Sequence, residues 1–139
     1  MRKNQSFSLD ELMRRIRKYL EGDFDLVVAI ERGGLLPAYL ASRFLNIPMR
    51  SLCINYRDEK NRQRFETPKL VRPKDFFSQN KKILLVDDVA KSGATLAFAK
   101  EQLPKAESVK TLVIYGVGDI SLFGELNKCV LWPWDKGAF

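Results

Sequence analysis

The chain has 139 residues, of which 45% are hydrophobic, and this length and composition fit one ordinary globular domain. Lysine and arginine number 24 against 17 acidic residues, which gives a formal net charge of +7. Histidine is absent, so Ser-His-Asp triads, Cys-His pairs and His-ligated zinc sites are excluded. Any proton transfer would have to use carboxylates, Lys, Tyr, Cys or water.

The cysteines and the apolar runs indicate the expected cellular environment. Cys53 and Cys129 each stand among apolar residues, which favours buried, reduced thiols over a disulfide or a structural zinc site. Apolar runs such as residues 83–86 are too short to span a membrane, and residues 1–10 lack the apolar core of a signal peptide. We therefore expect a cytoplasmic protein without membrane association.

The first half of the chain alternates between helical and extended patterns. Ser8 and Glu11 have the spacing of a capping box, and apolar residues at helical spacing predict a helix over residues 9–20, which Gly22 ends. The other elements expected in this half are a buried strand over 25–30, a glycine-containing turn over 31–34, a helix over 35–45 and a strand over 50–55.

The second half continues this alternation after a polar loop around residues 56–68. The expected elements are a short helix over 74–79, a strand over 82–86, a helix over 93–103, a strand over 110–115, a helical turn over 121–126 and a short strand over 129–132. Alternating strands and helices predict an α/β fold, a twisted and mostly parallel sheet flanked by helices. No repeat or linker divides the sequence, so we expect a single domain over residues 1–139.

The positive charge is concentrated in two stretches of the chain. Residues 1–22 hold six basic and three acidic side chains, and residues 50–82 hold ten basic and four acidic ones. The second stretch surrounds the polar loop. Such a loop can bind nucleic acid, close over a small anionic ligand or form an ordinary solvated surface, and composition leaves these three alternatives open.

Residues 83–95 carry the most informative motif. An apolar strand delivers Asp87 and Asp88 to its carboxyl end, where ligands of open α/β sheets bind. Small and hydroxylated residues then begin a helix, and backbone amides at a helix N-terminus form a phosphate site. The paired carboxylates fit the hydroxyl groups of a sugar, with Mg²⁺ offsetting the remaining charge. An ordinary strand-to-helix turn explains the small residues but not the two carboxylates.

Residues 86–95 resemble the phosphoribosyl-diphosphate (PRPP) binding loop of the type I phosphoribosyltransferases. The resemblance covers roughly residues 25–137 and is strongest to bacterial xanthine-guanine and archaeal purine phosphoribosyltransferases. It implies a Rossmann-like core with a small hood at about residues 55–70, and a base-pocket segment at about residues 117–139. The hood would exclude water from a reaction centre of oxocarbenium character.

The resemblance also implies a role for each matching residue. Asp87 and Asp88 would bind the ribose hydroxyls, and Asp88 with Asp135 would hold Mg²⁺. Residues 29–37 resemble the pyrophosphate loop, which often contains a non-proline cis peptide. The remaining implied residues are Lys91, Ser92, Gly93, Ala94 and Thr95 for the 5′-phosphate, Arg32, Gly33 and Arg64 for the diphosphate, Val117, Val130 and Trp132 for the base, and Lys91 and Asp88 for catalysis.

Three positions depart from the pattern of the 6-oxopurine enzymes. Lys91 stands where those enzymes usually have an acidic acid/base residue, Val117 where they have a Lys that reads the 6-oxo group, and Cys129 near an aromatic residue that stacks on the base. Trp132 and Trp134 fit either the base pocket or plain packing of the C-terminus. The phosphate and sugar half of the pattern is therefore intact, and the base half is not.

The resemblance implies a Mg²⁺-dependent transferase of purine salvage and nucleotide metabolism. It would move the 5-phosphoribosyl group from PRPP to a nitrogenous base, a 6-oxopurine by resemblance, and release diphosphate. Its partners would be PRPP, a nucleobase and further copies of the chain in a dimer or tetramer. Two alternatives are a non-catalytic PRPP-sensing regulator that binds RNA or DNA, and a transferase for a pyrimidine or a non-nucleobase acceptor.

Overall fold

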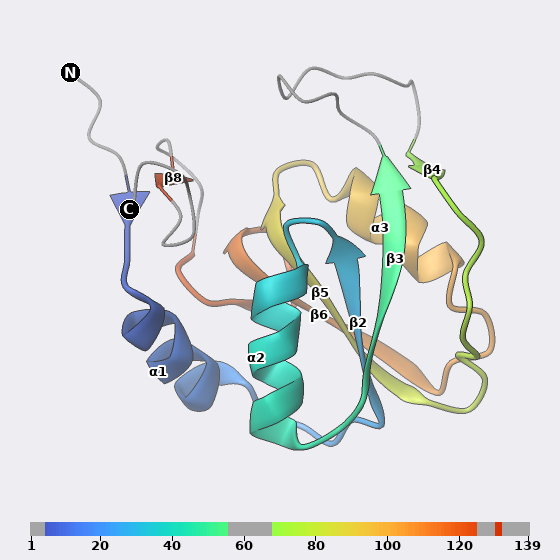
Figure 1. Cartoon of the computed structure of the whole chain (residues 1–139), viewed down its shortest axis with the longest axis horizontal. Coiled ribbons are helices and arrows are strands. Elements are labelled where there is room, and N and C mark those ends of the chain that lie inside the picture. Colours follow the sequence, from blue (N-terminus) through green and yellow to red (C-terminus); the bar gives the residue numbers. More distant parts are fainter. Residues whose placement is uncertain (1–4, 56–67, 125–129, 132–139) are drawn as a thin grey trace.

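A six-stranded sheet forms the centre of the protein (Figure 1). The computed structural model describes residues 5–55, 68–124 and 130–131. In spatial order the strands are β4 (Lys69–Leu70), β3 (Met49–Asn55), β2 (Leu26–Glu31), β5 (Lys82–Ala90), β6 (Ser108–Gly116) and β7 (Ile120–Ser121). All neighbours are parallel except β3 and β4, so the predicted α/β class and mostly parallel sheet are confirmed.

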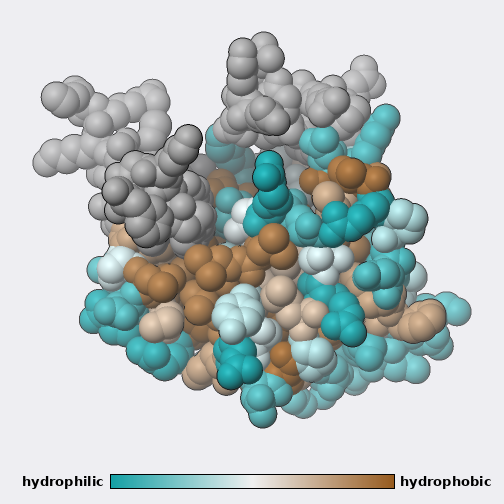
Figure 2. Space-filling model, in the orientation of Figure 1, coloured by the Kyte–Doolittle hydropathy of each residue, from teal (hydrophilic) through white to brown (hydrophobic). Residues whose placement is uncertain are grey.

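Helices cover both faces of this sheet. Helices α1 (Leu9–Tyr19) and α2 (Leu35–Leu45) lie on one face and α3 (Ala94–Glu101) on the other (Figure 1). Strand β5 shows why the strands read as continuous apolar runs: its successive side chains enter the two cores in turn, Leu84 toward α1 and α2 and Leu85 toward α3. Apolar side chains also remain exposed over α1 and α2 (Figure 2), among them Phe44 at 46%.

The N-terminal helix contacts the segment that follows β7. The Ser8 Oγ accepts the Glu11 backbone N–H at 3.1 Å, as its capping position predicts. One turn later, Arg15 donates to the Leu122 carbonyl at 2.9 Å and stacks over the Phe123 ring at 4.4 Å. Strand β1 (Gln5–Ser6) pairs in parallel with β8 (Val130–Leu131) in a separate two-stranded sheet. Segments from both ends of the sequence therefore lie side by side.

Two predicted helices are wrong. Residues 74–79 are mostly irregular, because tertiary contacts hold them to the end of α3: Lys74 Nζ donates to the Gln102 carbonyl at 2.9 Å, and Ser78 Oγ to the Pro104 carbonyl at 2.8 Å. The described part of 121–126 also has no helical turn, since Ser121 belongs to β7, which pairs with β6.

Several predicted boundaries also move. The helix expected over 93–103 runs over Ala94–Glu101, and the strand expected over 110–115 runs over Ser108–Gly116. The strand expected over 82–86 continues to Ala90, because β6 supplies pairing partners as far as Gly116. Residues 129 and 132 of the last expected strand lie outside the described residues.

The expectations for the cysteines, the membrane and the hood have separate outcomes. Cys53 is a free thiol, as expected, but it is only partly buried. Cys129 and most of the hood lie outside the described residues. In the described ranges, no helix is both long enough and apolar enough to cross a membrane.

Candidate active site

The strand order places a topological switch point between the carboxyl ends of β2 and β5. From β2 the chain passes through α2 to β3 on one side of the sheet, and it later returns as β5 on the other side of β2. Because connections leave in opposite directions from these two parallel neighbours, their carboxyl ends stay open, which is where open α/β sheets bind ligands. The turn after β2 and the two aspartates of β5 meet there.

Glycines allow the turn after β2 to touch β5. A Cβ added at Gly33 would overlap the Asp88 carboxylate, with Oδ1 2.7 Å away and the other carboxylate atoms nearer. At Gly34 a Cβ would lie 2.7 Å from the Ile30 carbonyl oxygen and nearer still to that of Val86. The peptide bond between Glu31 and Arg32, just before these glycines, is cis. Gly33 thus lies directly against the Asp88 carboxylate, and Gly34 lies against the backbone of Val86.

The two aspartates lie within β5 rather than after it, and their environments differ. Asp87 is buried, and burial, followed by the neighbouring charge of Asp88, raises the pKa of its carboxyl well above the ordinary value. Its Oδ1 accepts the Asp88 backbone N–H at 2.8 Å, and Asp88 Oδ1 accepts the Val89 N–H at 2.7 Å. These backbone donors fix one oxygen of each carboxylate.

The residues predicted to bind phosphate form the short connection from β5 to α3, residues 91–93, and the first two residues of α3, Ala94 and Thr95. Gly93 adopts a left-handed φ of 83° and begins the helix, and the Ala94 N–H donates to Ser92 Oγ at 3.3 Å. Lys91 and Ser92 are exposed, and Thr95 is half-buried. A helix N-terminus with free backbone amides and an adjacent lysine attracts an anion. The structure therefore brings all five predicted residues together beside the aspartates.

The loop after β6 brings Val117 to the same end of the sheet. Gly116 has a φ of 108°, and a Cβ there would overlap the Ala90 carbonyl, so β5 and the loop are in close contact. The Val117 N–H donates to that carbonyl at 2.9 Å, and the residue is 67% exposed. Asp119 closes the loop by accepting the Thr111 N–H at 2.8 Å, which lowers the pKa of the Asp119 carboxyl.

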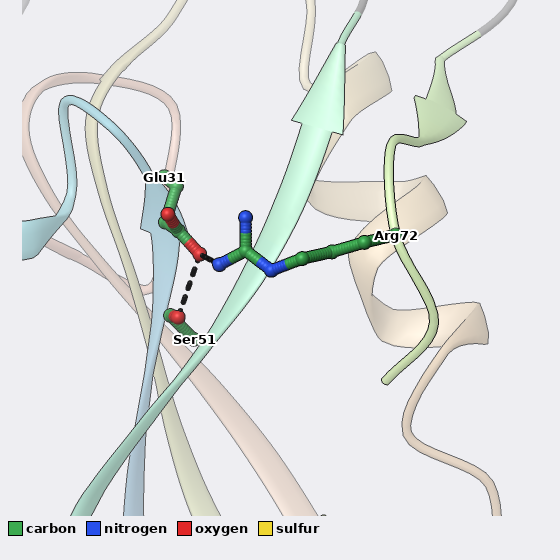
Figure 3. Close-up of polar contacts among 3 residues, drawn as sticks. All are labelled: Glu31, Ser51 and Arg72. Atoms are coloured by element: carbon green, nitrogen blue, oxygen red, sulfur yellow. Dashed lines mark hydrogen bonds and ion pairs between the residues drawn. The ribbon is translucent and has the colours of Figure 1, made fainter. Parts of the chain in front are cut away.

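Sequence reasoning missed a polar cluster beside the turn. Glu31, at the end of β2, accepts hydrogen bonds from Ser51 Oγ of β3 at 2.7 Å and from the guanidinium of Arg72, which follows β4 (Figure 3). The only sequence signals are an acidic residue next to Arg32 and a basic one within residues 50–82. Nothing local indicates that they pair, because the contact depends on β3 and β4 being neighbours.

Part of the predicted site is not described. Arg64, Trp132 and Asp135 lie outside the described residues, and of Val130 only the strand pairing with Gln5 is given. Among the residues that are described, no group of three or more acidic or cysteine side chains could hold a metal by itself. The oxygen donors of Asp87 and Asp88 nevertheless suit Mg²⁺, which proteins commonly bind through one or two carboxylates together with substrate phosphates.

Comparison with known proteins decides the family. Residues 3–120 match the family of the phosphoribosyl transferase domain. The chain belongs to this family. A xanthine-guanine phosphoribosyltransferase of Chromohalobacter salexigens is 32% identical over 99% of this chain and 88% of its own length, and one of Gluconobacter oxydans is 37% identical over 82% and 70%. The resemblance seen in the sequence is therefore confirmed.

Solved structures agree with this assignment. The phosphoribosyltransferase chain superposes on the purine phosphoribosyltransferase of Pyrococcus horikoshii with a TM-score of 0.76 and 25% identity, covering 98% of this chain and 96% of that one. A Neisseria gonorrhoeae protein with bound ppGpp gives a TM-score of 0.74 and 26% identity, covering 97% and 90%. The Rossmann-like architecture predicted for the type I family is thus the observed fold.

Proposed function

We propose that this phosphoribosyltransferase transfers the 5-phosphoribosyl group from PRPP to a 6-oxopurine. The bond between ribose C1 and the diphosphate oxygen breaks, a bond from C1 to a purine nitrogen forms, and diphosphate leaves. The observation that carries the proposal is the contact of Gly33 with Asp88, on the strand that leads into the N-terminus of α3. The turn, the aspartates and the helix N-terminus would provide separate sites for a diphosphate, a ribose and a phosphate.

The described residues supply the PRPP half of the mechanism. Asp87 and Asp88 accept hydrogen bonds from the ribose hydroxyls and orient the ring. Residues 91–95, from the end of β5 into the first turn of α3, hold the 5′-phosphate at the opposite end of the ribose. Arg32 and the backbone at Gly33 hold the diphosphate, with Arg64 as a further predicted contact. Fixing both ends of PRPP exposes C1 to the base and lowers the entropic barrier of the transfer.

Magnesium would be held by carboxylates of the site. Asp88, with Asp135 as the predicted second carboxylate, would hold Mg²⁺, and the bound ion would neutralise charge on the diphosphate as it leaves. Lys91 is exposed at the start of the connection to α3, and its ammonium group is a compact positive charge with three donors. We assign it electrostatic stabilisation and hydrogen-bond donation in place of the acid/base role of an aspartate.

The proposal that the acceptor is a 6-oxopurine rests more on the relatives of this chain than on its described residues. Val117 offers an apolar side chain, and its N–H is already bonded to Ala90, so it provides no donor for a 6-oxo group. Val130 and Trp132 complete the predicted base segment. The curated relatives are xanthine-guanine phosphoribosyltransferases, which supports a 6-oxopurine.

A panel of bases tests this function. Hypoxanthine, guanine, xanthine, adenine and uracil are each incubated with PRPP and Mg²⁺, and diphosphate release is measured. We expect release with at least one 6-oxopurine and none with uracil, and loss of release in Asp88→Asn. A control that removes an acidic side chain elsewhere is Asp23→Asn, whose partner Lys82 lies at the opposite end of β5. Release with pyrimidines alone would contradict the proposal.

A non-catalytic regulator is the second candidate. Lys91 in place of the acid/base residue and the net charge of +7 favour a protein that binds PRPP and a nucleic acid. PRPP binding measured by calorimetry, no diphosphate release with any base, and a salt-dependent gel shift of RNA or DNA would support it. Three further features also stay predictions: a single domain over residues 1–139, a cytoplasmic location and a homo-oligomer. Light scattering of the purified chain measures the oligomeric state.

A further inference from the structure

Glu31 occupies an unusual electrostatic position for a site that binds a polyanion. It ends β2, one residue before Arg32 and two before Gly33. Its side chain is only 14% exposed, so solvent screens its charge weakly. A carboxylate held there repels an anionic ligand unless a cation compensates it.

Arg72 supplies the compensating charge from a distant part of the chain. Its side chain extends across β3 to the Glu31 carboxylate, which also accepts a hydrogen bond from Ser51 of β3 (Figure 3). The Arg72 side chain is itself 56% exposed. One carboxylate thus connects the end of β2, the middle of β3 and the segment after β4.

We propose that Glu31 and Arg72 are positioning residues for the diphosphate turn, residues 32–34. Glu31 anchors the start of the turn to β3, and Arg72 cancels the negative charge that this anchor places beside the bound diphosphate. The inference rests on the proposed function, because it concerns PRPP as the ligand. In this role neither residue would contact the reacting atoms, so we expect their loss to change the affinity for PRPP and to leave the affinity for the base unchanged.

A charge-neutralising double-mutant cycle tests this role. Glu31→Gln, Arg72→Gln and the double variant are assayed for kcat, for KM of PRPP and of the base, and for thermal unfolding. We expect Arg72→Gln to raise KM for PRPP on the order of tenfold, because it leaves the Glu31 charge unpaired. The double variant recovers most of this loss, since the glutamine that replaces Glu31 carries no charge and still accepts from Ser51. The KM for the base changes in none of the three.

The matched control removes a neighbouring positive charge without unpairing Glu31. Lys74→Gln gives the same change in net charge two residues further along, where Lys74 donates to the Gln102 carbonyl. We expect its KM for PRPP to stay near that of the wild type. A large rise would show a general charge effect and overturn the inference.

Other outcomes separate this inference from the proposed function. If the double variant binds PRPP as weakly as Arg72→Gln, Arg72 binds the ligand directly and the positioning role is wrong. If the variants lose thermal stability with an unchanged KM for PRPP, the cluster serves the fold alone. If the wild type binds PRPP by calorimetry and the cycle shows no rescue, only this inference fails. If the wild type does not bind PRPP, the proposed function fails with it.

Discussion

Replacing Gly33 by alanine tests the contact between the turn after β2 and Asp88 of β5. The added Cβ would lie 2.7 Å from Asp88 Oδ1 and nearer to Oδ2, whereas ordinary contacts of a Cβ begin at 3.4 Å. The carboxylate must therefore move by roughly an ångström. Its Oδ1 accepts the Val89 N–H at 2.7 Å, so this movement also breaks the bond that fixes it.

This displacement sets the size of the expected effect. Misplacing a binding group by about 1 Å costs about 100-fold, so the affinity of Gly33→Ala for PRPP should fall by about 100-fold. That loss corresponds to about 2.7 kcal/mol of binding free energy. Gly33 does not have a left-handed φ, and the atoms it would meet belong to a side chain rather than to backbone. We therefore expect the unfolding temperature to change by only a few degrees.

Gly34→Ala is the companion variant in the same turn. Its Cβ would meet the backbone oxygens of Ile30 and Val86, which no side-chain rotation can move away. It should lose about 1–3 kcal/mol of folding free energy. Calorimetry with PRPP and Mg²⁺ measures the loss of affinity expected in Gly33→Ala, and thermal unfolding measures the loss of stability expected in Gly34→Ala. Wild-type affinity in Gly33→Ala, or parallel losses of affinity and stability in both variants, would refute the reasoning.

Three further predictions concern charge and metal. Burial raises the pKa of Asp87, so the folded state retains its proton more tightly and wild-type stability should fall as pH rises from the ordinary Asp pKa through the raised one. In urea unfolding, Asp87→Asn should flatten the decline of stability with pH and stabilise the protein at neutral pH, and it should abolish PRPP binding. An unchanged pH profile of stability would contradict the raised pKa of Asp87. The hydrogen bond from the Thr111 N–H is the main cause of the lowered pKa of Asp119. The ionised Asp119 carboxylate therefore stabilises the fold above the ordinary Asp pKa, and this stabilisation is lost as the pH falls through the lowered pKa of the folded state. Asp119→Ala should therefore lose roughly 1 kcal/mol of unfolding free energy at neutral pH, with a smaller loss in acid. Chelation of Mg²⁺ should stop diphosphate release and added Mg²⁺ should restore it, so turnover that persists in chelator would rule out the metal.

The local elements were predictable because their causes are local. The Ser8 cap and the apolar spacing of α1 act within a few turns of one helix, and the buried strands read directly as apolar runs. The end of β5 was less predictable, because the strand continues past Val86 only where β6 offers it partners. Residues 74–79 carry a helical pattern, but contacts to the end of α3 override it.

The motif that runs from the end of β5 into α3 contains its own chemistry, so the sequence determined the family and the sugar and phosphate part of the candidate site. Two adjacent carboxylates followed by small residues at a helix N-terminus are a property of consecutive residues. The tertiary structure alone decided what lies opposite them. The placement of Gly33 against Asp88 depends on the order of β2 and β5, and the pairing of Glu31 with Arg72 depends on the β3–β4 pairing. Such contacts join residues distant in sequence, and no local pattern of side chains encodes them.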